Sequence, residues 1–457
     1  MKKDEIVYLY LIAFHVAIGM LVFIAPFLSL LYGYSIVIFG ALIIIKKQNK
    51  NNEALLAAGY VVGSEVFLRM TGGNPLYEIS KYAVMIFLFI GMIYTGFSKN
   101  ATPYWIFLIL LIPSVLLSTF VLNHDTDMRK TIAFNISGPV CLAVASIYNF
   151  RRKISLESVN AVLLSMGLPI ITTMVYLIFY APNIRDIVTG TSSNVETSGG
   201  FGPNQVSTIL GLGVFIFFSR IILESRTKNM ALINLIIAFV MAYRGLVTFS
   251  RGGMITGFFM IVLLLFFLYF KSNSKGRLKL NILSILLFVA LGSVWSYSSH
   301  QTSGLIEKRY ANQDALGRSK KSNFSGREEI AKGEWEIFLK NPIFGVGVGK
   351  GVEVRAEKKG KNSTNISHDE ITRMLAEHGT LGIIGLLILF FTPFVLYLEN
   401  KFNMFLLCFV LFWLLTINHA AMRIAAPAFV YSLSLLNINL GEISKKRVTE
   451  EMPLLAN

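Results

Sequence analysis

The chain has 457 residues, of which 54% are hydrophobic and only 15% are charged. Soluble domains carry about 25% charged residues, so the composition excludes an ordinary soluble protein and indicates an integral membrane protein. The net charge of +16 fits lysine and arginine retained on cytoplasmic loops. It does not indicate nucleic acid binding, because that requires a basic soluble face.

Apolar blocks follow one another along nearly the whole chain. The first block, after Met1-Lys2-Lys3, is too long for the core of a signal peptide, and we expect it to remain as the first span. Because a spanning helix needs about 20 apolar residues, the blocks predict an all-α membrane protein with about 12–14 transmembrane helices. The blocks are 6–45 (two spans), 54–71, 77–97, 105–122, 131–149, 160–181, 205–224, 230–249, 254–270, 281–297, 380–398, 404–417 and 426–440.

The basic residues predict the orientation of the bundle. With the N-terminus in the cytoplasm, the strongest basic clusters all fall in connections on the cytoplasmic side, as the positive-inside rule expects. The long polar interval from about His300 to Gly382 then lies on the periplasmic side. The clusters are Lys46/Lys47/Lys50, Lys99, Arg151/Arg152/Lys153, Arg226/Lys228, Lys271/Lys275/Arg277/Lys279, Lys401 and Lys445/Lys446/Arg447.

These features predict three parts of the chain. Residues 1–297 are expected to form an N-terminal transmembrane bundle, and residues 298–379 a large periplasmic catalytic loop with short helices. Residues 380–457 are expected to supply the C-terminal transmembrane helices and a cytoplasmic tail.

Several polar residues lie at the outer ends of the predicted spans. Arg251 interrupts an apolar run within Ser250-Arg251-Gly252-Gly253, where glycines let the backbone approach a ligand and the guanidinium matches phosphate oxygens. Arg244 lies seven residues before it at the outer end of a span, and such an arginine either binds a ligand or extends to lipid phosphates. Asn204, after a glycine-rich run, belongs to a flexible connection or to a substrate-facing loop.

The long loop contains a predicted helix that begins near Arg327. Ser325 and Glu328 have the spacing of a capping box, and Asn341-Pro342 should end the helix at about Lys340. Arg327 then lies in the first turn, where a cation is unfavourable for the helix dipole. Such a broken local rule indicates a function. The apolar face, Ala331, Trp335, Phe338 and Leu339, is expected to lie against the membrane surface or the spans.

The loop ends in the segment that we expect to carry chemistry. Ser367-His368-Asp369-Glu370 opens an amphipathic helix in which Arg373 stands at pairing distance from Glu370 and Glu377. Gly345 to Gly351 departs from the P-loop spacing and is interpreted as a flexible turn. No set of residues shows the spacing of metal ligands, so we expect no metal site.

Several short motifs occur in a characteristic order along the second half of the chain. They are Ser250-Arg251-Gly252, Gly326-Arg327 with Trp335, Asn341-Pro342-Ile343-Phe344-Gly345-Val346-Gly347, His368, and Leu375-Ala376-Glu377-His378-Gly379 followed by Gly382. In this order they resemble the O-antigen ligase and O-antigen polymerase superfamily. The resemblance extends from Arg251 to Gly382, and the pattern of spans agrees over the whole chain.

The resemblance implies a GT-C-like glycosyltransferase of the bacterial inner membrane. Such an enzyme moves a glycan from undecaprenyl diphosphate to a hydroxyl of lipid A-core, another glycan or a protein, at the periplasmic face. By position, His368 is the essential histidine, and Arg251 and Arg327 bind the diphosphate; Arg244, Asn204 and Arg373 are further candidates for substrate binding. Asp369 stands where the family commonly has asparagine, so no role transfers to it.

The chemistry of these residues is consistent with that activity. Preorganised arginines stabilise the charge that grows on a leaving diphosphate, and a histidine with a pKa near 6.5 accepts the proton of the acceptor hydroxyl. Direct displacement inverts the anomeric carbon and needs no metal, nucleotide or other cofactor.

The sequence leaves the acceptor open. A ligase, a polymerase of repeat units and a protein O-oligosaccharyltransferase would share the donor site. A transporter of lipid-linked oligosaccharides is the alternative from another class. Transporters tend to have broken or polar helices at mid-membrane, whereas the charged residues here gather at one face and in one loop.

Overall fold

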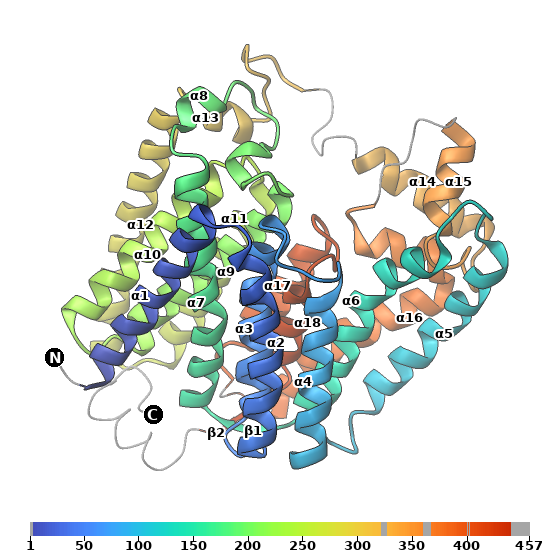
Figure 1. The fold of residues 1–457 in the computed structure, drawn as a ribbon, viewed down its shortest axis with the longest axis horizontal. Helices are drawn as coiled ribbons and strands as arrows, with labels where there is room; N and C mark the ends of the chain where they lie inside the picture. The colour runs from blue at the N-terminus through green and yellow to red at the C-terminus, as the bar shows by residue number, and fades with distance from the viewer. Residues whose placement is uncertain (1–2, 321–326, 360–366, 400, 402, 440–457) are drawn as a thin grey trace.

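The computed structural model describes the chain except for residues 1–2, 321–326, 360–366, 400, 402 and 440–457. The described part is almost entirely helical (Figure 1). The helices are α1 (Lys3–Ile24), α2 (Leu28–Lys47), α3 (Glu53–Met70), α4 (Ile79–Thr95), α5 (Thr102–Val121), α6 (Met128–Asn149), α7 (Leu156–Tyr180), α8 (Ile184–Ile187), η1 (Glu196–Ser198), α9 (Pro203–Leu223), α10 (Lys228–Leu246), α11 (Arg251–Lys271), α12 (Ser274–Gln301), α13 (Leu305–Tyr310), α14 (Arg327–Lys340), α15 (Lys350–Lys359), α16 (Glu370–Glu399), α17 (Leu406–Ile417) and α18 (Ala425–Leu433).

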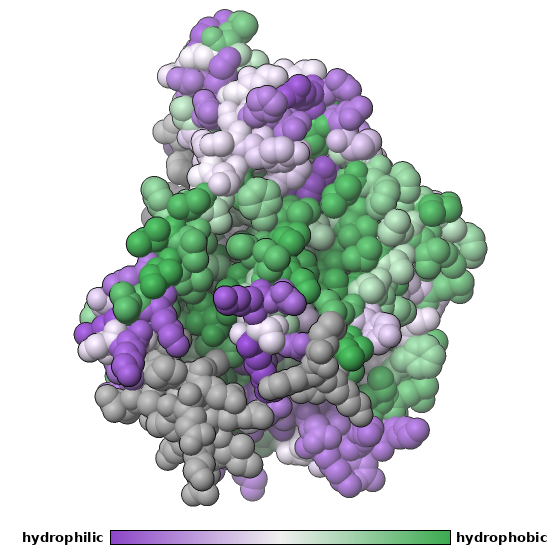
Figure 2. Space-filling model, turned by 90° about the vertical axis from the view of Figure 1, so that its left-hand side faces the viewer, coloured by the Kyte–Doolittle hydropathy of each residue, from purple (hydrophilic) through white to green (hydrophobic). Residues whose placement is uncertain are grey.

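The predicted all-α membrane fold is confirmed. Within the described ranges, ten helices are long and apolar enough to cross a bilayer, and α4 and α17 are shorter apolar helices. Each of the fourteen predicted spans overlaps a helix. Figure 2 shows the surface expected of such a protein, with a hydrophobic belt between two hydrophilic ends.

The helices run back and forth between two ends of the molecule. One end, here called the loop face, carries residues 302–320, 327–359 and 367–369 with the short helices α13, α14 and α15, at the top of Figure 1. The opposite face carries a two-stranded parallel sheet of β1 (Lys153–Ser155) and β2 (Asn437–Asn439). Among the described residues, the basic clusters that predicted the orientation lie in connections at this opposite face.

Glycines bring α9 and α11 into backbone contact near the loop face. A Cβ atom on Gly253 would lie 2.2 Å from the carbonyl carbon of Ser207, and one on Gly211 would lie 2.2 Å from the oxygen of Gly253. Small residues commonly allow this close approach between membrane helices. The contact fixes the first turn of α11, which begins at Arg251, against the first turns of α9.

The hairpin of α17 and α18 differs from the two spans predicted for 404–417 and 426–440. The helices have 12 and 9 residues, so at 1.5 Å per residue α17 is about 18 Å long, well short of a hydrocarbon core of about 30 Å. The turn between them, 418–424, is almost entirely buried. It is held in part by Glu65, whose carboxylate accepts a 2.6 Å hydrogen bond from the amide of Ala425.

Helix α16 is broken at Gly379, which has φ +62° and ψ −141°. The break separates residues 370–378, whose polar side chains are largely buried, from the long apolar part. The turn before α15 packs into the break, because the amide of Thr380 donates to the carbonyl of Pro342 at 2.7 Å. The direction of the first part of α16 therefore depends on this turn.

Candidate active site at the loop face

Four segments distant in sequence meet at the loop face. They are the first turn of α9, the first turn of α11, the start of α16 and the turn between α17 and α18. Ser250 donates to the side-chain oxygen of Asn204 at 2.8 Å, and the amide of Ala421 donates to the carbonyl of His368 at 3.0 Å. The ring of His419 fills the space in front of Gly252, where an added Cβ would lie 2.5 Å from it. His419 thus connects the pair formed by α9 and α11 with the pair formed by the start of α16 and the turn between α17 and α18.

Three arginines lie close enough to influence one another. Arg251, at the start of α11, donates to the carbonyl of Arg309 at 3.4 Å. Burial, followed by the charges of Arg251 and Arg327, lowers the pKa of Arg309. Burial and then Arg251 lower the pKa of Arg327, while Asp369 opposes this change. This concentration of positive charge is suited to an anionic ligand.

His368 lies two residues before α16, and its side chain is exposed. Partial desolvation, followed by the charges of Arg327 and Arg423, lowers the pKa of His368 from 6.5 to about 4. The imidazole is therefore neutral at pH 7 and able to accept a proton. Arg327, predicted as its partner in the site, is near enough to affect its titration.

Sequence analysis did not assign a role to the turn between α17 and α18, yet this turn contributes two charged or titratable groups. Arg423 donates to the carbonyl of Ser367 at 2.9 Å and to Asn135 at 3.3 Å, and its guanidinium lies 4.1 Å from the centre of the Phe134 ring. His419 lies 3.0 Å from the hydroxyl of Thr208. The polar sequence Asn418-His419 with Arg423 inside an apolar stretch was the available signal.

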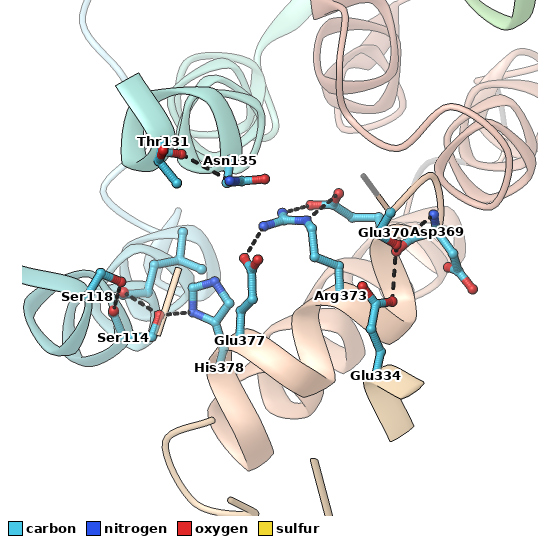
Figure 3. Close-up of polar contacts among 12 residues, drawn as sticks. Ser114, Ser118, Thr131, Asn135, Glu334, Asp369, Glu370, Arg373, Glu377 and His378 are labelled. Atoms are coloured by element: carbon cyan, nitrogen blue, oxygen red, sulfur yellow. Dashed lines mark hydrogen bonds and ion pairs between the residues drawn. The ribbon is translucent and has the colours of Figure 1, made fainter. Parts of the chain in front are cut away.

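Arg373 is engaged in a buried ion-pair cluster. Its guanidinium lies between the carboxylates of Glu370 and Glu377, as Figure 3 shows, and the bond to Glu377 measures 2.5 Å. The i,i+3 and i,i+4 pairs predicted from the sequence are thus confirmed. The same contacts give Arg373 a structural role at the start of α16, which does not support its predicted contact with substrate.

Arg244 also has structural partners. It is buried, and its guanidinium donates to the carbonyls of Leu177 at 2.6 Å and Ala181 at 3.1 Å. Carbonyl groups at the end of a helix tend to lack partners within the helix, so Arg244 caps the end of α7 at Ala181 and adds a second donor to the carbonyl of Leu177, which already accepts from the amide of Ala181. This geometry does not support the predicted contact with substrate. Asn204, by contrast, lies beside Ser250 next to Arg251.

The loop preceding α15 is a packed turn, so its interpretation as a flexible segment was wrong. Gly345, Gly347 and Gly349 have φ of 68°, 94° and 81°, values that L-residues rarely adopt. The amides of Val346 and Gly347 donate to carbonyls of α16. Beside this turn, His378 is buried and its ring points toward Ser114 of α5 (Figure 3).

The helix predicted in the loop is present as α14, with Arg327 as its first residue and Lys340 as its last. The proposed N-cap, Ser325, lies outside the described residues. Trp335 and Leu339 are exposed, and the buried positions are Glu334 and Ile337, so these two apolar side chains do not pack on the spans, and their contact with the membrane surface stays a prediction. The polar Glu334 faces the protein for a reason that the hydrophobic pattern does not show.

The part of the chain that the structure describes contains no cluster of three or more His, Cys, Asp or Glu residues able to hold a metal ion. Residues 236–387 match the family model Wzy_C, described as O-Antigen ligase. This range includes Arg244, Arg251, Arg327, His368 and Arg373, but excludes Asn204 and the turn with His419 and Arg423. No curated protein matches the chain.

Proposed function

We propose that this chain, which matches the O-antigen ligase family model over residues 236–387, transfers a glycan from undecaprenyl diphosphate to an acceptor hydroxyl. The family match supports membrane glycan processing of the ligase or polymerase type. The protein is a multi-pass membrane protein. We place it in the bacterial inner membrane with the loop face toward the periplasm, since the described basic clusters lie at the opposite face.

In this proposal Arg251 and Arg327 hold the diphosphate of the donor. Support comes from their mutual influence and from that of Arg309, because three cations at one place are costly without an anion. An entering diphosphate would neutralise this charge. Asn204, bonded to Ser250, is placed to orient the first residue of α11.

His368 acts as the general base. The acceptor oxygen forms a bond to the anomeric carbon while the bond from that carbon to the phosphate oxygen breaks. The acceptor's proton passes to the imidazole, and undecaprenyl diphosphate leaves with the electron pair, stabilised by the arginines. Direct displacement of this kind inverts the anomeric centre and involves no metal in the proposed step.

The observation that carries the proposal is the electrostatic coupling of His368 to Arg327, and of Arg327 to Arg251. A general base and a diphosphate site must be a few ångströms apart to act on one donor. Residues 251, 327 and 368 are far apart in sequence, and folding brings them to one place at the loop face.

The test uses purified protein in nanodiscs with undecaprenyl-diphosphate-linked glycan and measures both transfer and release of undecaprenyl diphosphate. His368→Ala should abolish both while leaving donor binding intact. His300→Ala is the matched control, because His300 is a loop-face histidine in contact with Arg185. Full activity of His368→Ala would remove the imidazole from the mechanism.

The glycans of a deletion strain distinguish the acceptors. Loss of long chains from lipid A-core with accumulation of carrier-linked polymer indicates a ligase, whereas products with a single repeat indicate a polymerase. Glycan missing only from a protein indicates an O-oligosaccharyltransferase. Movement of intact carrier-linked glycan across a vesicle bilayer, without release of undecaprenyl diphosphate, would indicate a transporter and contradict the proposal.

A further inference from the structure

One buried carboxylate joins the helix that carries Arg327 to the residue that precedes His368. Glu334, on α14, is 1% exposed. It accepts hydrogen bonds from Ser367 at 3.1 Å, Thr372 at 2.6 Å and Arg355 at 2.7 Å. These donors belong to two segments of the chain, α15 and the start of α16, so a single side chain ties α14 to both.

Burying a carboxylate at this position carries a desolvation cost. Burial raises the pKa of Glu334, and Arg355 together with the hydroxyls of Thr372 and Ser367 opposes that change. Apolar residues of similar volume often replace buried ion pairs without loss of stability. What an apolar side chain cannot supply here is the directional bond to the Ser367 hydroxyl. The hydrogen bond to Ser367 therefore explains the carboxylate at position 334 better than packing alone.

Glu334 follows Arg327 by seven residues on the same helix. Seven residues make almost two turns, so the two side chains share one face of α14 at an axial separation of about 10 Å. At the other end of the contact, Ser367 is the immediate neighbour of His368. A fixed bond between Glu334 and Ser367 thus limits how far the backbone of His368 can move from α14.

The same peptide is held from its other side by the turn between α17 and α18. Arg423 donates to the carbonyl of Ser367 at 2.9 Å, and the amide of Ala421 donates to the carbonyl of His368 at 3.0 Å. These two bonds hold the backbone but do not connect it to α14. Among the described contacts of Ser367, the one with Glu334 provides that connection.

We propose that Glu334 is a positioning residue, which sets the place of His368 relative to Arg327 through its hydrogen bond with Ser367. The proposal rests on the function given above. A base and a leaving-group site carried on separate segments need such a link, because an error of about 1 Å in their separation can reduce turnover by about 100-fold.

Ser367→Ala removes the bond to Glu334 and two local bonds between the hydroxyl and the backbone of Asp369, and it leaves Glu334 with Arg355 and Thr372. Glu334→Gln is tested beside it, because that variant leaves the local bonds to Asp369 in place, and both variants must show the effect. We expect kcat for transfer from undecaprenyl-diphosphate-linked glycan to fall by about 10-fold or more, with KM for the donor changed by less than about 3-fold. Ser367→Thr retains a hydroxyl and should recover most of the loss. Ser299→Ala is the control, since it breaks a 2.6 Å bond to Glu307 elsewhere on the loop face.

A second measurement separates this proposal from the function on which it rests. The titration of His368 is followed by NMR in histidine-labelled protein without substrate, with assignment from His368→Gln; the chain has 6 histidines. Arg327 and Arg423 lower the pKa of His368, so a ring released from α14 moves away from Arg327 and its pKa rises. Ser367→Ala and Glu334→Gln should both show this rise, and Ser299→Ala should not.

The outcomes are distinct. A shifted titration in protein that never transfers glycan retains the positioning role and rejects the proposed activity. An unchanged titration together with unchanged kcat in Ser367→Ala overturns the positioning role, even if Glu334→Gln fails to fold. A loss of thermal stability with kcat per folded molecule unaltered shows that Glu334 serves the fold alone, and also overturns it.

Discussion

Replacing Gly253 by alanine should push α9 and α11 apart and displace the residues at the start of these two helices that belong to the candidate site. The new Cβ would lie 2.2 Å from the carbonyl carbon of Ser207, whereas carbon atoms in contact normally stand 3.5–4.0 Å apart. Because the obstructing atom belongs to the backbone, no side chain can move aside. The two helices must therefore separate by roughly 1.5 Å.

The displacement acts directly on the proposed donor site. Arg251 lies two residues before Gly253, and the 2.8 Å bond from Ser250 to Asn204 would be stretched beyond hydrogen-bonding distance. We expect transfer to fall by about 100-fold and the free energy of unfolding to fall by about 1–3 kcal/mol. The variant is assayed for release of undecaprenyl diphosphate and for thermal unfolding in nanodiscs.

Gly292→Ala on α12 provides the matched control. A Cβ at Gly292 meets no atom within 4 Å, and alanine favours a helix over glycine by about 1 kcal/mol. Its activity should stay unchanged and its Tm unchanged or slightly higher. If Gly253→Ala retained the activity and Tm of Gly292→Ala, the close contact of α9 and α11 and its link to the donor site would both be refuted.

Two further predictions separate electrostatic from structural arginines. If neutral His368 is the base, kcat/KM should fall as the pH falls through its pKa of about 4, and removing a neighbouring cation should move this limb to higher pH. Arg327→Gln should therefore shift the limb upward by less than about 1 pH unit, since desolvation is the larger cause, while Lys332→Gln on the exposed side of α14 should not; a limb moving to lower pH would contradict the sign. Arg244→Met should lower stability by about 1–3 kcal/mol, because the carbonyl of Ala181 loses its donor and that of Leu177 loses one of two, with activity per folded molecule kept within about 2-fold. Selective loss of donor binding at unchanged Tm would instead restore Arg244 as a binding residue.

Hydropathy predicted the helices well because membrane spans are set by local composition. The fourteen predicted spans each overlap a helix, but the apolar blocks did not reveal that α17 and α18 are too short to cross a bilayer. The length of a block measures only how many apolar residues are consecutive. Whether they lie in lipid or in a buried hairpin depends on the surrounding helices, here in part on Glu65 holding the amide of Ala425.

For the charged residues, too, the sequence predicted the position along the chain, and the structure decided the partners. Arg251 and Arg244 looked alike in sequence, since each stands near the end of an apolar run. The structure gives Arg244 the carbonyls of α7 as partners and places Arg251 next to Arg309. A sequence states where a charge lies along the chain, whereas its partners come from segments brought near only by folding.

The amino-acid sequence by itself determined the membrane class, the helices and the helix that begins at Arg327, because hydrophobic length and local helix signals act over a few turns. Tertiary structure decided that the turn with His419 and Arg423 joins the site and that Glu334 ties α14 to Ser367. Hydrogen bonds and charge interactions act over a few ångströms in space, so their partners can be hundreds of residues apart in sequence.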